Sequence, residues 1–78
     1  MRTSVPPIYR VIGNNILRHR RGQRMTQEEL GLRCDMEGST ICDYEKAART
    51  YKVDTLERVA RGLGVAIEEL LKEEQDAR

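Results

Sequence analysis

Residues 26–45 read TQEELGLRCDMEGSTICDYE, and this stretch predicts two short helices joined by a tight turn. The Thr26 hydroxyl can cap the first helix, and Glu29, three residues later, completes the reciprocal pattern of a capping box. Asp35 interrupts the helical pattern and is one of the few non-glycine residues that accept a positive φ. The second helix is expected to begin near Gly38.

The turn between these two helices is short enough to fix how they cross. Helices joined in this way cross steeply, so the second helix keeps an exposed face while Ile41 and Tyr44 turn inward. This is helix-turn-helix geometry, in which the second helix is the one that enters the major groove of DNA.

A set of spaced residues extends well beyond this stretch. It comprises Arg20, Thr26, Gln27, Glu28, Glu29, Leu30, Ile41, Glu45, Leu56, Ala60, Leu63, Gly64, Val65, Glu69, Leu70 and Leu71. In this order and spacing the chain resembles the lambda-repressor-like, Cro/CI-type helix-turn-helix family, also called the XRE family, from about Ile12 to Leu71. The resemblance implies a compact five-helix bundle that binds DNA.

Composition independently favours an all-α fold. The 78 residues contain no Phe or Trp and only three Tyr, so the core must be aliphatic, and no β-branched run has the two-residue period of a strand. A chain of this size makes one small domain. No apolar run reaches the roughly 18 residues of a membrane span and no signal-peptide pattern opens the chain, so we expect a cytoplasmic protein without a membrane partner.

The residues available for catalysis or metal binding are few. Cys34 and Cys42 lack the spacing of zinc or redox sites, and His19 is the single histidine, so two reduced thiols and no cofactor are expected. No paired carboxylates, phosphate-binding glycine loop or metal set is present, which argues against an enzyme. The sequence also leaves no evident place for a small-molecule effector.

Charge divides the chain into two unlike halves. Residues 1–52 carry ten Arg or Lys against six Asp or Glu, a net charge of +4, whereas residues 53–78 carry four against seven, a net charge of −3. Such a polarised molecule is suited to binding nucleic acid on one side only.

Outward from the motif, three segments are expected. Residues 1–6 form a flexible arm, residues 7–72 the helix-turn-helix domain and residues 73–78 a polar tail. Pro7 suits the first turn of a helix that ends near Gly22, with an inward stripe of Ile8, Ile12 and Ile16. The stripe of a later helix is expected to comprise Val53, Leu56, Val59, Ala60 and Leu63, and a short helix after Gly64 turns Leu70 and Leu71 inward.

The resemblance also implies a structural ion pair. In the family an arginine at the place of Arg20 pairs with the glutamate that ends the recognition helix, here Glu45. The family usually has Gly or Asn where Ala47 stands, because the chain there enters the left-handed region. Either the helix continues past this point or Ala47 is mildly strained.

Two groups of residues are expected to contact the DNA backbone. Thr26 and Gln27 lie at the start of a helix, where unpaired N–H groups and the helix dipole favour a phosphate. Lys46, Arg49 and Lys52 follow the recognition helix and can hold the other side of the backbone, although simple solvation of these cations is an even alternative.

The family's base-reading positions map onto Gly38, Ser39, Thr40 and Asp43. None is an Arg, Gln or Asn that reads guanine or adenine with two hydrogen bonds, although Asp43 can accept from cytosine. Three explanations stay open: readout of DNA shape, a slightly different register, or loss of base readout in favour of protein binding.

These residues predict a sequence-specific transcriptional regulator that binds an operator in double-stranded DNA as a homodimer. The expected dimer interface comprises Val65, Ile67, Leu70 and Leu71, unless these residues only close the core. The alternative function is a protein-interaction module, antitoxin-like or an adaptor, which the acidic residues near the recognition helix favour.

Overall fold

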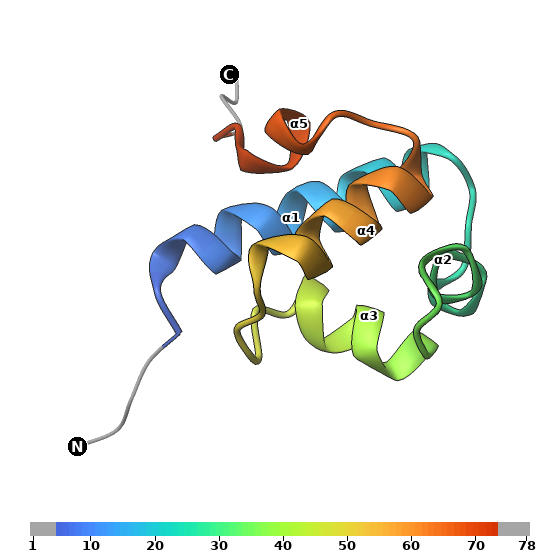
Figure 1. Cartoon of the computed structure of the whole chain (residues 1–78), viewed down its shortest axis with the longest axis horizontal. Helices are drawn as coiled ribbons and strands as arrows, with labels where there is room; N and C mark the ends of the chain where they lie inside the picture. The colour runs from blue at the N-terminus through green and yellow to red at the C-terminus, as the bar shows by residue number, and fades with distance from the viewer. Residues whose placement is uncertain (1–4, 74–78) are drawn as a thin grey trace.

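The structure, a computed structural model, describes residues 5–73, and its regular elements over that range are helices. They are α1 (Pro7–Gly22), α2 (Gln27–Cys34), α3 (Gly38–Glu45), α4 (Val53–Leu63) and α5 (Ile67–Leu71) (Figure 1). The expected all-α, five-helix fold is confirmed. Residues 1–4 of the expected arm and 74–78 of the expected tail lie outside the described residues, so these segment boundaries stay predictions.

The helix α1 is the element on which the bundle is assembled. Pro7 occupies its first turn, where the missing N–H of proline costs no hydrogen bond. Figure 1 shows α1 across the middle of the molecule, with α5 above it and α3 below it, and both helices pack against it. The helix α2 packs against α3 and α4 instead, so the motif joins the rest of the bundle through α3 on α1 and through α2 on α4.

A glycine allows α1 to approach α3 closely. A Cβ atom at Gly13 would lie 2.5 Å from the carbonyl oxygen of Tyr44 and 2.8 Å from that of Glu45, distances at which the backbone would have to move. The end of α3 is therefore held against α1 at a separation that no side chain at residue 13 would permit.

The core is mostly aliphatic, as the composition predicts, and every helix contributes to it. Its buried members are Ile12, Ile16, Met25, Leu30, Cys34, Ile41, Tyr44, Leu56, Val59, Ala60, Leu63 and Leu70. Three apolar residues expected inside are exposed instead: Ile8 by 44%, Val53 by 73% and Leu71 by 41%. Each lies in the first or last turn of its helix, where the helical period continues but no neighbouring element covers the side chain.

A buried asparagine joins α1 to the end of α5. The Asn15 side chain is 1% exposed, and its Nδ2 donates to the carbonyl oxygens of Leu70 at 2.9 Å and Lys72 at 2.8 Å. Leu70 is in the last turn of α5 and Lys72 follows the helix, and neither carbonyl is an acceptor inside the helix. The amide therefore fixes a five-residue helix that is too short to be stable alone.

The three tyrosines form one cluster. The rings of Tyr9 and Tyr51 meet edge to face with centroids 4.9 Å apart, and the rings of Tyr44 and Tyr51 lie 4.3 Å apart. The Tyr9 hydroxyl also donates to the Tyr51 carbonyl oxygen at 2.8 Å. The cluster thus connects the start of α1, the end of α3 and the segment 46–52 between α3 and α4.

None of the helices within residues 5–73 has both the length and the apolar character needed to cross a membrane.

Candidate nucleic-acid interface

The capping box expected at the start of α2 is present. The Thr26 hydroxyl accepts from the Glu29 N–H at 3.0 Å, and the Glu29 carboxylate accepts from the Thr26 N–H at 2.8 Å. The box satisfies two of the first N–H groups and leaves those of Gln27 and Glu28, which a helix cannot satisfy internally. The Thr26 hydroxyl accepts in this box and keeps its own O–H, so this helix end offers a phosphate that O–H and the two backbone N–H groups.

The turn between α2 and α3 has the left-handed residue that the sequence predicts. Asp35 has a φ of 63°, and the Met36 N–H donates to the Gly31 carbonyl oxygen at 2.8 Å. A Cβ atom at Gly31 would lie 2.5 Å from the Met36 carbonyl oxygen, so the tight turn depends on glycine at this place.

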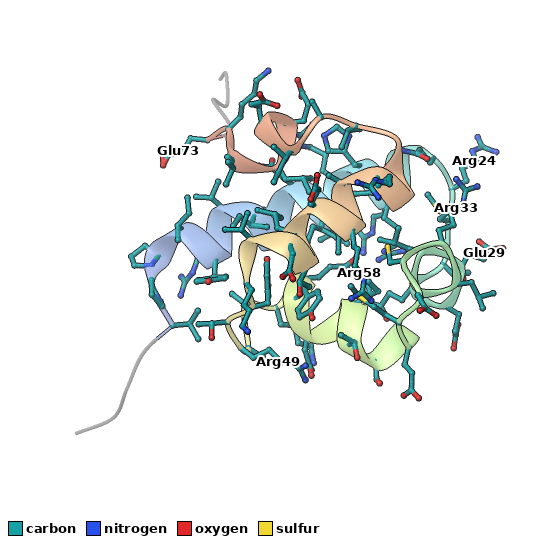
Figure 2. All side chains as sticks on the ribbon, viewed as in Figure 1. Arg24, Glu29, Arg33, Arg49, Arg58 and Glu73 are labelled. Carbon is teal, nitrogen blue, oxygen red and sulfur yellow. The ribbon has the colours of Figure 1, made fainter. Side chains whose placement is uncertain are left out.

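Arg58 of α4 holds the end of α2 from outside the motif. Its guanidinium donates to the carbonyl oxygen of Cys34 at 3.0 and 3.3 Å and to that of Asp35 at 3.2 Å. These carbonyls are at the negative end of the helix dipole, where a cation is favoured. Figure 2 shows the Arg58 side chain between the ribbons of α4 and α2.

Glu45 at the end of α3 is the centre of a buried polar network. Arg20 donates to its two carboxylate oxygens, from Nε at 2.6 Å and from Nη2 at 3.1 Å, and a further Arg20 nitrogen donates to the Met25 carbonyl oxygen at 2.8 Å. The side chains of Arg20 and Glu45 are only 11% and 5% exposed. The hydrogen bonds from Arg20 to Glu45 raise the pKa of Arg20 above its usual value, although burial opposes the shift.

Gln27 completes this network, a contact that the sequence did not suggest. Its Nε2 donates to Glu45 Oε1 at 2.9 Å, so the first residue of α2 is joined to the last residue of α3. Arg20 and Gln27 together fix the crossing of the two motif helices. Removing one partner of a desolvated ion pair commonly costs about 3–5 kcal/mol, because the other charge stays buried.

The expected base-reading residues lie on or beside the outward side of α3, opposite the buried Ile41 and Tyr44. Ser39 is exposed, and Gly38, Thr40 and Asp43 are half-buried. Seven residues after Ser39, Lys46 continues the same helical face and is also exposed. Cys42 is half-buried and lies three residues after Ser39, so it borders this face too. Its spacing from Ser39 could have indicated this position.

The segment after α3 resolves the alternatives raised for Ala47. The helix ends at Glu45, and Ala47 has a φ of 54°, so the residue is strained rather than helical. Arg49 follows, with its guanidinium carbon 5.6 Å from the centre of the Tyr44 ring and one nitrogen 3.5 Å from Asp43 Oδ2. The side chains of Arg49 and Asp43 in this long ion pair are 52% and 41% accessible to solvent, so the pair stabilises the fold little.

The remaining predicted residues, Lys52 and the expected dimer interface, differ in how far they are exposed. Lys52 is exposed at the start of α4, away from the turn of the motif. Of the expected dimer interface, Val65 and Ile67 are half-buried against the core and Leu71 is exposed. Leu70 is fully buried in the bundle, and Asn15 donates to its carbonyl oxygen, so its place in that interface stays a prediction that this burial does not favour.

Comparisons with known proteins agree with this geometry. The model of a family described as a helix-turn-helix domain matches residues 16–72. The control protein C.BamHI of Bacillus amyloliquefaciens is 36% identical over 47 residues, which are 60% of this chain and 58% of that protein. The match therefore spans less than two thirds of that relative's length.

Solved structures provide two further comparisons. The hypothetical transcription factor NHTF from Neisseria has a TM-score of 0.82 at 24% identity, covering 94% of this chain and 87% of that one. The restriction-modification controller protein C.Esp1396I, solved as a tetramer in complex with its natural 35 base-pair operator, has a TM-score of 0.72 at 26% identity, covering 83% and 96% of the two chains. With the matching family model and the α2–turn–α3 geometry, these findings establish that the chain belongs to the helix-turn-helix domain family.

Proposed function

We propose that this protein is a sequence-specific, double-stranded-DNA-binding transcriptional regulator that acts as a homodimer on an operator in the cytoplasm. The observation that carries the proposal is that α3 is fixed on its inner side and uncovered on its outer side. Its inner side is fixed by Ile41, Tyr44 and the Arg20–Glu45–Gln27 network, while Ser39 and Lys46 on its outer side are exposed. A recognition helix must be held rigidly and present an uncovered face to the major groove.

Backbone contacts would come from both ends of the motif. The N–H groups of Gln27 and Glu28 and the positive end of the α2 dipole suit a phosphate at one end. Beyond the other end of α3, Lys46 and Arg49 are exposed cations. Such contacts fix the register of a protein on the duplex and carry no sequence information.

Base readout would depend on short side chains. Ser39 can donate or accept, the Thr40 methyl can contact a thymine methyl, and Asp43 can accept from cytosine N4. A side chain at Gly38 would be crowded, because a Cβ atom there would lie 3.2 Å from the backbone of Glu28. Of the three explanations left open by the sequence, we favour readout of DNA shape as the supplement to these few contacts.

Two similar proteins support the proposal. C.Esp1396I was solved on its natural operator, and C.BamHI is a control protein. No catalytic role is proposed for this chain. The alternative, a protein-interaction module that keeps the fold, has one supporting observation, which is the acidic pair Glu37 and Asp43 at the recognition helix.

Titration of a labelled duplex at several salt concentrations tests the proposal by fluorescence anisotropy. The duplex is first selected by the protein from a random pool, and an unselected duplex serves as the comparison. The affinity for DNA should fall steeply as the salt concentration rises. Lys46→Ala should lower the affinity for both duplexes alike and reduce the slope of log affinity against log salt concentration by about one, because one phosphate contact is lost. Ser39→Ala should instead reduce the preference for the selected duplex.

Arg61→Ala is the matched control. Arg61 is an exposed cation on α4, paired with Glu57 at 3.5 Å, and lies outside the motif. Its removal should leave the salt slope unchanged. If the wild-type protein ignores both duplexes at low ionic strength but retains a protein partner, the interaction-module alternative replaces the proposal.

A further inference from the structure

The first third of the chain carries side-chain charges of one sign only. The first acidic residue is Glu28, and the residues before it include six arginines: Arg2, Arg10, Arg18, Arg20, Arg21 and Arg24. The helix α1 is therefore a surface helix without a carboxylate. A helix face that is merely solvated usually carries charges of both signs.

Three of these arginines, Arg10, Arg21 and Arg24, form what we call the arginine band. All three are exposed. Within residues 5–73, none of their side chains takes part in a hydrogen bond or an ion pair. Arg18 and Arg20, in contrast, are engaged by hydrogen bonds inside the protein. The band thus consists of the arginines of α1 and the following turn that have no role in holding the described fold together.

The spacing along α1 places the band on one side of the helix. Arg21 follows Arg10 by 11 residues, close to three full turns, so the two side chains project from the same side about 16 Å apart. Asn14, also exposed, lies between them on that side, and the buried Ile12 and Ile16 lie on the opposite one. A single DNA strand has a phosphate about every 3.4 Å of duplex axis, so it can meet cations at this separation.

The arginine band lies between the two ends of the helix-turn-helix motif. One turn after Arg10, a Cβ atom at Gly13 would lie 2.5 Å from the Tyr44 carbonyl oxygen, so this part of α1 is against the end of α3. At the other end of the band, Arg24 is two residues before Thr26, the N-cap of α2. The band therefore joins the proposed phosphate contacts at the start of α2 to those after α3.

The backbone at Arg24 supports a role for its side chain. Its N–H donates to the Arg21 carbonyl oxygen at 2.9 Å, and its φ is 61°, a conformation that glycine would adopt without strain. Strained residues of this kind cluster at functional sites. Figure 2 shows the Arg24 side chain outside the ribbon at the turn between α1 and α2.

We propose that the arginine band binds the phosphate backbone of the duplex held by the motif, an inference that rests on the proposed function. Guanidinium groups match phosphate with paired hydrogen bonds, and a row of cations without carboxylates complements a polyanion. A protein partner is disfavoured, because none of the large exposed apolar residues, Ile8, Leu32, Val53 and Leu71, is on this side of α1 to anchor it.

Fluorescence-anisotropy titration of the selected and unselected duplexes with the full chain, at several salt concentrations, tests the inference. Arg10→Gln with Arg21→Gln should reduce the slope of log affinity against log salt concentration by about two per bound copy, because two phosphate contacts are lost. The preference for the selected duplex should not change, because phosphate contacts carry no sequence information. Both arginines are exposed, so the variant should keep its helical circular dichroism spectrum.

Two further variants separate this contact from a general effect of charge. Arg10→Lys with Arg21→Lys keeps both cations and should keep the wild-type slope. Arg61→Gln with Lys72→Gln removes the same charge elsewhere, from α4 and from the residue after α5, and should leave the slope unchanged. The side chains of Arg61 and Lys72 are 75% and 62% exposed, so this control should fold as well.

Each other outcome overturns the inference. An unchanged slope in the Arg10→Gln, Arg21→Gln variant, or an equal decrease in the Arg61→Gln, Lys72→Gln control, would exclude a phosphate contact by the band. Loss of affinity for single-stranded RNA of the same length, with the affinity for duplex DNA intact, would assign the band to another nucleic acid. A wild-type protein that binds neither duplex contradicts the proposed function as well. A wild-type protein that binds both duplexes, with a slope insensitive to the glutamine changes, contradicts only the arginine band.

Discussion

Ala47 is a residue whose backbone conformation disagrees with its side chain. It follows the last turn of α3 with a φ of 54°, and its N–H donates to the Tyr44 carbonyl oxygen at 3.1 Å. An L-residue with a Cβ atom loses roughly 1–2 kcal/mol in the left-handed region, and glycine does not. The strain is located at the junction between the recognition helix and the segment that carries Arg49.

Ala47→Gly should therefore stabilise the protein. The relief of strain exceeds the extra freedom that glycine gives the unfolded chain, so we expect a net gain of about 0.5–1 kcal/mol, or an increase in Tm of several degrees. Thermal unfolding followed by circular dichroism measures it. The neighbouring Ala48, whose φ is not positive, supplies the control, since Ala48→Gly should be neutral or destabilising. Equal effects of the two changes would contradict the strain.

At the scale of the elements, the motif depends on a helix outside it. Arg58 of α4 donates hydrogen bonds to the carbonyl oxygens of Cys34 and Asp35 at the end of α2. These bonds fix the start of the turn that leads to α3. Because hydrogen bonds from a charged donor are stronger than neutral ones, this contact contributes to the orientation of α2 as well as to stability.

Arg58→Ala should destabilise the fold by about 1 kcal/mol, reduced from the value of a fully buried bond because the arginine is largely exposed. Arg61→Ala, one turn later on α4, removes only an exposed pair with Glu57 and should change stability by less than about 0.5 kcal/mol. Urea unfolding of both variants measures the difference. If the two changes cost the same, the contacts of Arg58 with Cys34 and Asp35 do not stabilise the protein.

Helix positions were more predictable than what covers each helix. The capping box, the positive φ of Asp35 and the ends at Gly64 and Gly38 follow from local chemistry, which is written in a few neighbouring residues. The helical period predicts which side chains of a helix face the core. It does not predict how far along the helix a neighbouring element covers those side chains. For this reason Val53 and Leu71 were expected inside and lie outside.

The candidate site shows the same division between local and distant information. The resemblance implied the pairing of Arg20 with Glu45, which the structure contains. The bonds from Gln27 to Glu45, from Arg58 to Cys34 and from Asn15 to Leu70 span 18, 24 and 55 residues, and no local pattern marks them. Long-range polar contacts of this kind depend on how whole helices pack, so they require the fold.

At the scale of the whole molecule, stability should depend on alkaline pH through Tyr51. Burial raises the pKa of Tyr51 above its usual value, and the neighbouring Tyr9 and Tyr44 raise it further. The folded protein therefore retains a proton that the unfolded chain releases near pH 10, so stability is unaffected by this group below about pH 9 and falls as pH rises above about 10.

Tyr51→Phe should flatten this alkaline decline. The Tyr51 hydroxyl is buried without a hydrogen-bond partner among the described residues, so its removal should not destabilise the fold at neutral pH. Urea unfolding at about pH 8 and about pH 10.5 compares the two proteins. Burial also raises the pKa of Cys34, so this thiol too lowers stability as the pH rises. Both proteins contain Cys34, so its effect cancels when their declines in stability are compared. An unchanged decline in the variant would exclude Tyr51 as its source.

The tyrosine cluster gives the protein an optical reporter of its own. With no Trp or Phe in the chain, its ultraviolet emission comes only from Tyr9, Tyr44 and Tyr51, which lie in contact with one another. Tyr44 belongs to the end of α3, and Tyr9 and Tyr51 line a surface hollow together with Val53. Unlabelled protein should therefore signal spectroscopically when either neighbouring surface is occupied, and a tryptophan-containing partner can be excited without interference from the chain itself.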